Sequence, residues 1–201
     1  KNINNHDLVV YSSAIQLDNV EIIESQNKSI PIIRRAEMLA ELLKLKETSI
    51  AISGTHGKTT TCSMLASILF EAKLNPTLVI GGIVNNFGSN AVSGKGDIIV
   101  VEADEFDRSF LSLRPNMGII NNLDFEHTDC YKDIDDVKNT FLKFANALPF
   151  YGMLGICIDD KNVKSIINKI KRPYKTFGLT KEADIHAENI EYLGFKSQFN
   201  L

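Results

Sequence analysis

The sequence is short of several features, and each shortage excludes a class of protein. Its three cysteines, Cys62, Cys130 and Cys157, are widely spaced and form no Cys-x-x-Cys pair. This argues against a disulfide framework and against a zinc site, and it favours a reducing compartment, the cytoplasm. No apolar run approaches the roughly 20 residues that a membrane-spanning helix needs. The first residues do not have the layout of a signal peptide.

An excess of positive charge is also lacking. A net charge of -3 at pH 7 provides no basic surface for nucleic acid, so any phosphate must be recognised locally. The hydrophobic content of 44% is enough for one core, or for one core and part of another. The chain starts without Met and stops inside a strand-like pattern. We therefore expect it to be a fragment of a longer protein.

Short strand-like runs alternate with apolar residues at helical spacing. Strands are predicted at 8–11, 30–33, 49–53, 77–80, 97–102, 117–121, 153–158 and 174–177, and helices from 18 and at 35–46, 59–72, 135–148 and 160–170. In the 59–72 helix, the residues expected to face inward are Met64, Leu65, Ile68 and Leu69. The alternation predicts an α/β fold with a mostly parallel, doubly wound sheet. A domain boundary is expected just before residue 48, which divides the chain into residues 1–47 and 48–201.

A glycine loop, Ser-Gly-Thr-His-Gly-Lys-Thr-Thr-Thr at 53–61, stands between a predicted buried strand and an amphipathic helix. Such a loop aims backbone N–H groups and a helix N-terminus at an anion. Lys58 is expected to reach the β- and γ-phosphates, and the Thr59 hydroxyl to bind Mg²⁺. The general pattern GxxxxGK[ST] requires glycine where the chain has Ile52. The alternative is a glycine-rich turn with a chance Gly-Lys-Thr. The predicted ATP-binding residues are Gly54, Thr55, His56, Gly57, Lys58, Thr59 and Thr60.

Acidic residues and a histidine follow two further strands, at the sheet edge where open α/β sheets bind ligands. Glu102 begins the run Glu-Ala-Asp-Glu and is placed to hold the Mg²⁺ that bridges ATP oxygens. For Asp104 and Glu105, an ordering or solvating role in this loop is the alternative. His127 lies in a third loop at the same edge, where an imidazole binds a second metal or steadies a reacting carboxylate. The alternatives are a surface acidic turn and an ordinary loop histidine.

Together these stretches resemble the Mur ligases, most closely the branch that adds L-alanine. That family carries the shorter loop form G-T-x-G-K-[ST]-[ST], which matches without a gap. The further shared stretches are Arg35–Leu39, Gly81-Gly82, Gly88–Ala91, Asp107–Phe110, Asn121–Asp129, Leu148–Gly152 and Cys157–Asp160. The resemblance covers essentially the whole chain, and it implies a P-loop central domain at 48–201 after the tail of a Rossmann-like UDP-binding domain at 1–47.

The resemblance also implies a reaction and its site. ATP would phosphorylate the lactyl carboxylate of UDP-N-acetylmuramate, and L-alanine would attack the acyl phosphate, in peptidoglycan synthesis in the cytoplasm. Lys58 would stabilise the γ-phosphoryl group, and Thr59 and Glu102 would hold one Mg²⁺. His127, with Glu102, would hold a second. We expect no nucleic-acid or membrane partner.

Contacts to the muramyl substrate are implied for a separate set of residues, namely Gly82, Asn90, Ser12 and Ser13. Ordinary turns are the alternative for the two serines. One departure is Glu126, where the family often has Asp. The rival functions are a murein-peptide recycling ligase, which attaches a tripeptide, and a non-catalytic ATP-binding module. Folylpolyglutamate synthase shares the glycine loop, but the acidic and histidine stretches argue against it.

Overall fold

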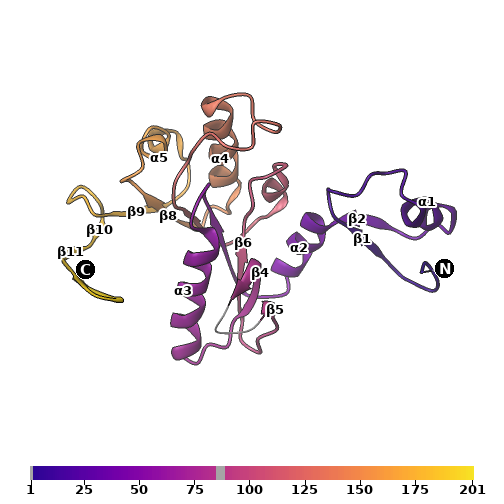
Figure 1. Ribbon diagram of the computed structural model, residues 1–201, viewed down its shortest axis with the longest axis horizontal. Coiled ribbons are helices and arrows are strands. Elements are labelled where there is room, and N and C mark those ends of the chain that lie inside the picture. The colour runs from indigo at the N-terminus through magenta and orange to yellow at the C-terminus, as the bar shows by residue number, and fades with distance from the viewer. Residues whose placement is uncertain (1, 85–88) are drawn as a thin grey trace.

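The computed structural model describes residues 2–84 and 89–201. An eight-stranded sheet forms its centre, a small two-stranded unit with a helix lies at one end, and a β-hairpin lies at the other (Figure 1). Among the described residues, no helix is long and apolar enough to cross a membrane. Gly88, part of one shared stretch, lies outside the described residues.

The N-terminal unit contains the parallel strands β1 (Val9–Tyr11) and β2 (Ile32–Arg34), joined by α1 (Val20–Asn27). The helix begins at Asn19, whose side chain accepts a hydrogen bond from the Glu21 N–H at 2.9 Å. Helix α2 (Arg35–Leu43) follows β2 without a loop. Its last residue, Leu43, is buried in the core of the central sheet, so α2 joins the two units. The boundary predicted after residue 47 follows this helix and stays a prediction.

The central sheet confirms the predicted mostly parallel α/β architecture. Its order is β10-β9-β8-β7-β3-β6-β4-β5, and within this sheet, over its described residues, only the β4–β5 pair is antiparallel. The strands are β3 (Thr48–Ser53), β4 (Thr77–Val84), β5 (Ser89–Val92), β6 (Ile98–Glu102), β7 (Met117–Ile120), β8 (Met153–Cys157), β9 (Tyr174–Gly178) and β10 (Ile185–His186). Because β3 lies between β6 and β7, the loops that follow these three strands meet at one edge.

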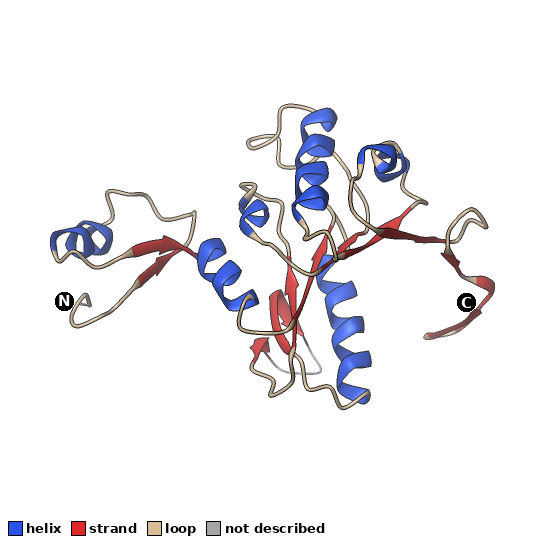
Figure 2. Ribbon diagram, turned by 180° about the vertical axis from the view of Figure 1, so that it is seen from behind, coloured by secondary structure: helices blue, strands red, loops and turns tan. Residues whose placement is uncertain are grey.

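Helices cover both faces of this sheet (Figure 2). Helix α3 (Lys58–Glu71) packs on one face, and α4 (Ile134–Ala147), α5 (Lys161–Lys164) and two 3-10 turns, η1 (Ser109–Ser112) and η2 (Ile167–Lys169), lie on the other. Side chains of β3 alternate between the two cores, as a strand requires. Ile50 and Ile52 pack towards α3, whereas Ala51 packs towards α4. Burial on both faces explains the unbroken apolar pattern of the central strands.

Two expectations for helices were wrong. Met64 and Ile68 of α3 are 64% and 65% exposed instead of facing inward. The inward stripe is formed by Cys62, Ala66 and Leu69. The small side chains of Cys62 and Ala66 let the helix approach the sheet closely. The helix predicted at 160–170 divides into α5 and η2.

The last part of the chain forms a hairpin. Its second strand contains the strand-like pattern noted at the end of the sequence, whereas its first strand was not predicted. An antiparallel hairpin of β11 (Glu188–Leu193) and β12 (Lys196–Asn200) turns at Gly194, whose φ is 66°. Strands β5 and β10 were also missed. All of these strands are short or exposed, so they lack the apolar runs that identify buried strands.

Candidate nucleotide and metal site

The loop between β3 and α3 is shaped by two glycines with positive φ. Gly57 caps α3 with φ 77° and Gly54 has φ 138°, both unfavourable for side chains with a Cβ. A Cβ at Gly54 would also lie 3.1 Å from the Cβ of Asn121. The first N–H groups of α3 have no partner within the helix. They therefore open into the space above the sheet edge, where an anion would bind.

The segment after β7 holds this loop in place. The Asn122 amide accepts a hydrogen bond from the His56 N–H at 2.7 Å and donates one to the His56 carbonyl at 3.0 Å. The Asn121 side chain donates to the Thr61 hydroxyl at 3.0 Å. The Asp124 N–H donates to the Thr55 hydroxyl at 2.9 Å. These asparagines were not among the predicted site residues, although two amides directly after a buried strand were a usable signal.

Lys58 is largely buried and folds back over its own loop. Its ammonium donates to the carbonyls of Gly54 at 2.8 Å and Thr55 at 3.2 Å, and to Glu105 Oε2 at 2.7 Å. The Lys58 side chain is 12% exposed and that of Glu105 is 2% exposed. The loop thus places one cation at its centre, beside the free N–H groups of α3.

Thr59 and Glu102 meet as the sequence predicted. The Thr59 hydroxyl lies 3.0 and 3.1 Å from the two Glu102 carboxylate oxygens. The Gly81 N–H donates to Glu102 Oε2 at 2.8 Å, and a Cβ on Gly81 would lie 3.2 Å from that oxygen. At the neighbouring Gly82, a Cβ would lie 3.4 Å from Thr59 Cγ2. Gly81 therefore fixes the carboxylate without crowding it.

This pair fits a magnesium ion that also binds nucleotide phosphates. Mg²⁺ prefers oxygen ligands and is held by one or two carboxylates, with phosphates and water completing the shell. No cluster of three or more His, Cys, Asp or Glu side chains suited to a metal occurs within residues 2–84 and 89–201. A hydroxyl and one carboxylate beside a phosphate loop are the donor set expected for a metal shared with ATP.

Glu105 is buried, which the sequence analysis did not anticipate. Burial raises the pKa of its carboxyl, and the nearby Lys58 ammonium only partly offsets this effect. Its backbone carbonyl accepts a hydrogen bond from the Tyr131 hydroxyl at 2.7 Å. Within the described structure, Glu105 Oε1 is buried and has no hydrogen-bond partner. The nearest ion contact of this oxygen is with His127 Nε2, at 3.7 Å.

The backbone around His127 and Glu105 adopts strained conformations that the contacts of Arg108 stabilise. His127 has φ 55°, and Asp107 and Arg108 have φ 42° and 60°, which residues other than glycine rarely adopt. The Arg108 guanidinium donates to the Cys130 carbonyl at 2.8 Å. It also donates to the Asp136 carboxylate at 2.5 Å, which joins the two loops to α4. Strain of this kind persists only where surrounding contacts enforce it, and it concentrates at functional sites.

The other predicted loop residues lie at the periphery. His56 is exposed, with Nε2 3.5 Å from Glu126 and 3.9 Å from Asp124. Glu126 thus remains an acidic neighbour of the loop. Thr60 is exposed in the first turn of α3. The exposed side chains of His56 and Thr60 are therefore both accessible to a bound nucleotide.

A cavity of about 410 Å³ opens beside Glu102. Gly81 and Asn90 line it together with Arg35, and apolar side chains of α2 form its opposite wall. Ser13 is not part of the cavity lining and instead hydrogen-bonds Asp107. Partial burial acts to raise the pKa of Asp107, but hydrogen bonds from Ser13 and Ser109 outweigh it, and the pKa is lowered. Ser12 makes a local turn, accepting from the Ala14 N–H at 3.3 Å.

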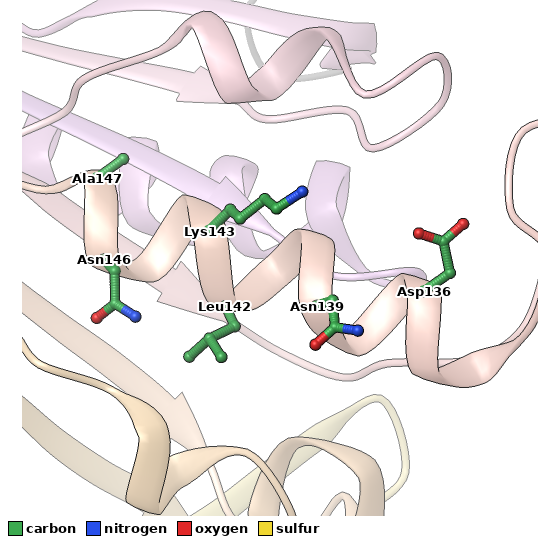
Figure 3. Close-up of a pocket in the computed structure, with 6 residues that line it drawn as sticks. All are labelled: Asp136, Asn139, Leu142, Lys143, Asn146 and Ala147. Carbon is green, nitrogen blue, oxygen red and sulfur yellow. The ribbon is translucent and has the colours of Figure 1, made fainter.

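A larger hollow of about 590 Å³ follows α4 (Figure 3). All of its lining side chains come from this one helix, and they do not converge on a common point. They are Asp136, Asn139, Leu142, Lys143, Asn146 and Ala147. It is therefore a surface groove, and we assign it no role in the site.

Comparison with known proteins agrees with this geometry. A family model described as the Mur ligase middle domain matches residues 52–201, and one described as the Mur ligase family catalytic domain matches residues 1–47. The UDP-N-acetylmuramate–L-alanine ligase of Geotalea uraniireducens is 48% identical over 99% of this chain and 43% of its own length. The chain thus spans less than half of that relative.

Solved structures with the same fold belong to related ligases. The UDP-N-acetylmuramate:L-alanyl-γ-D-glutamyl-meso-diaminopimelate ligase of Neisseria meningitides superimposes with a TM-score of 0.79 and 27% identity, over 92% of this chain and 62% of that one. The UDP-N-acetylmuramate–alanine ligase of Thermotoga maritima gives 0.77 and 27%, over 94% and 42%. These matches show that the chain belongs to the Mur ligase family, and the glycine loop with the adjacent Thr59–Glu102 pair agrees with them.

Proposed function

We propose that this chain forms the ATP- and metal-binding part of a ligase that joins L-alanine to UDP-N-acetylmuramate, through an acyl phosphate, in peptidoglycan synthesis. The observation that carries the proposal is the 48% identity to an L-alanine-adding ligase over 99% of the chain. The meeting of Lys58, Thr59 and Glu102 at one sheet edge supports it.

The first chemical step is transfer of the γ-phosphoryl group of ATP to a carboxylate. Such a step requires positioning and neutralisation of charge more than covalent help from the protein. The N–H groups at the start of α3 bind the phosphates, and Lys58 supplies a positive charge to the transferred group. Thr59 and Glu102 would hold Mg²⁺, which, when bound, would reduce the repulsion between the carboxylate and ATP.

The cavity beside Glu102 suits the acceptor. It brings Asn90, a hydrogen-bonding amide, and Arg35, a cation, close to the metal-binding carboxylate. A cation and an amide at a mostly apolar wall are suited to an anionic nucleotide sugar. We propose that Gly82 and Asn90 border the muramyl part of the substrate. Ser12 and Ser13, on the N-terminal unit, then lie towards the UDP part.

Two other functions compete with this one. A recycling ligase that attaches a tripeptide shares the fold, and one solved example and the solved alanine-adding ligase are both 27% identical to this chain. The preference for L-alanine therefore comes from the curated relative at 48% identity. A non-catalytic module would need only the phosphate loop. A non-catalytic role does not explain why Glu102 and His127 lie at the same sheet edge as the phosphate loop.

The deciding experiment measures phosphate release from ATP by a full-length protein carrying this chain. UDP-N-acetylmuramate is supplied with L-alanine or with the murein tripeptide. We expect release to depend on the nucleotide sugar and L-alanine, and to collapse in Lys58→Ala and His127→Ala. The control is Lys44→Ala, which removes an exposed ion pair with Glu41 and costs little stability.

Each other result has a definite meaning. Release that depends on the tripeptide would assign the protein to the recycling branch. ATP binding without release for either acceptor would favour the non-catalytic module and refute the proposed reaction.

A further inference from the structure

Arg108 joins three parts of the molecule through one side chain. Its guanidinium donates to the Cys130 carbonyl at 2.8 Å, in the loop after β7, and to the Asp136 carboxylate at 2.5 Å, in the first turn of α4. The same group lies 4.8 Å from the centre of the Tyr131 ring. Arg108 itself belongs to the loop after β6, so these contacts tie two loops of the sheet edge to a helix. We call these three contacts the Arg108 brace.

The Arg108 brace holds a backbone that would otherwise relax. Arg108 has φ 60° and Asp107 has φ 42°, a left-handed conformation that is unfavourable for residues with a Cβ. Such a conformation persists only where surrounding contacts enforce it. A planar guanidinium holds two acceptors and stacks on an aromatic ring at the same time, whereas the ammonium of lysine does not. The side chain of Arg108 is therefore matched to this place by its shape as well as by its charge.

The braced loops fix the position of Glu105. Its carbonyl accepts hydrogen bonds from the Tyr131 hydroxyl at 2.7 Å and from the Arg108 N–H at 3.0 Å. Tyr131 and Glu105 are both 2% exposed, and close packing leaves buried groups little room to move independently. A shift of Arg108 or Tyr131 would therefore shift Glu105 as well.

Glu105 in turn orients Lys58. The carboxylate accepts from the ammonium at 2.7 Å, and the carbonyls of Gly54 and Thr55 are the other two acceptors of this ammonium. An ammonium has three N–H donors. A phosphate can replace the two carbonyls while Glu105 keeps its hydrogen bond, so the carboxylate directs the charge of Lys58. Orientation of this kind matters because a misplacement of about 1 Å can slow a reaction about a hundredfold.

We propose that Arg108 is a positioning residue for phosphoryl transfer: its brace fixes Glu105, and Glu105 holds Lys58 in the orientation that the transferred group requires. The side-chain hydrogen bonds of Arg108 go to Cys130 and Asp136 and not to the phosphate loop, so its effect passes through Glu105. The effect on catalysis rests on the function proposed above. The effect on the order of the phosphate loop does not.

The first test compares Arg108→Gly with Arg108→Ala in a full-length protein carrying this chain. Glycine adopts φ 60° readily, so Arg108→Gly removes the brace but not the backbone conformation, whereas Arg108→Ala also keeps the strain. We expect kcat for phosphate release to fall by about tenfold or more in Arg108→Gly and further in Arg108→Ala. The KM for ATP should change less, because the orientation is needed most in the transition state. The matched control, Lys164→Ala, removes another ion pair of 2.5 Å, with Glu182, and should change neither value.

Chemical rescue separates positioning from folding. The Arg108 side chain is 36% exposed, so in Arg108→Gly a small guanidinium compound can reach the same acceptors from solvent. Millimolar methylguanidinium should restore part of kcat, whereas urea, which is neutral and of similar shape, should not. Asp136→Asn should lower kcat less than Arg108→Gly does. The double variant Arg108→Gly/Asp136→Asn should be no slower than Arg108→Gly and should resist rescue.

Hydrogen exchange tests the link to the phosphate loop without catalysis. In Arg108→Gly we expect faster amide exchange at 103–108 and also at 53–58, although the Arg108 side chain makes no hydrogen bond to the second segment in the described structure. Lys164→Ala should exchange like the wild type in both segments. Thermal melting gives the folded fraction of each variant.

The outcomes separate the two proposals. If Arg108→Gly turns over like the wild type, or if exchange at 53–58 is unchanged, Arg108 does not position Lys58 and this inference alone fails. It also fails if kcat falls only in proportion to the folded fraction and methylguanidinium restores nothing. If the wild type releases no phosphate with either acceptor, the proposed function fails, and hydrogen exchange alone decides whether Arg108 orders the phosphate loop.

Discussion

The clamp between Asn122 and the phosphate loop can be tested by one truncation. Asn122→Ala removes two hydrogen bonds to the His56 backbone, of 2.7 and 3.0 Å. Each bond contributes about 0.5–1.5 kcal/mol, so the loop should lose about 1–3 kcal/mol of positional stability. If nucleotide binding must restore the loop, its affinity falls by about 5- to 150-fold. Titration with a fluorescent ADP analogue measures this loss, and urea unfolding measures global stability.

Asn146 provides a matched control far from the loop in the chain. Its side chain also makes two bonds to backbone, donating to the Lys169 carbonyl at 3.3 Å and accepting from the Lys171 N–H at 2.7 Å. Asn146→Ala should therefore lower the unfolding midpoint without changing nucleotide affinity. If both variants weaken nucleotide binding equally, or if Asn122→Ala leaves it unchanged, the clamp does not position the loop.

Three further predictions concern the metal pair and the core. Gly81→Ala places a methyl group 3.2 Å from Glu102 Oε2; we expect weaker Mn²⁺ binding in the nucleotide complex, and unchanged binding would contradict a tight fit there. Phe144→Ala removes a fully buried ring stacked on Phe110, so unfolding in urea should become easier by about 3–5 kcal/mol; a loss below 1 kcal/mol would show that the core refills. Burial raises the pKa of the Cys62 thiol to about 12, so at pH 8 iodoacetamide should label Cys130 but not Cys62 in the native protein, by mass spectrometry. Labelling of both at equal rates would show that α3 opens readily.

Much of the fold was readable because the central strands are buried on both faces. Their unbroken apolar runs, such as Ile98–Val101, appear in any sequence of this class. Shorter and exposed strands, including β5 and the β11–β12 hairpin, carry no such signal. In α3 the predicted inward positions were half right, since Leu69 is buried and Leu65 packs against the core, whereas Met64 and Ile68 are exposed. Hydrophobicity alone favoured Met64 and Ile68, whereas close packing on the sheet selected the smaller Cys62 and Ala66.

The phosphate loop could be predicted because its chemistry is local. Gly54, Gly57, Lys58 and Thr59 lie within six residues, and a strand and a helix flank them. The meeting of Thr59 with Glu102 followed from one further rule, since loops after neighbouring parallel strands share an edge. These inferences needed only the order of elements along the chain.

What the sequence by itself determined was therefore the fold class, the phosphate loop and the edge at which the acids gather. Only the tertiary structure showed that Glu105 is buried between Lys58 and His127, and that the two asparagines after β7 clamp the loop. The reason is that burial and pairing depend on residues up to 69 positions apart in the chain. Their contacts arise from strand register and side-chain packing, neither of which leaves a periodic trace in the sequence.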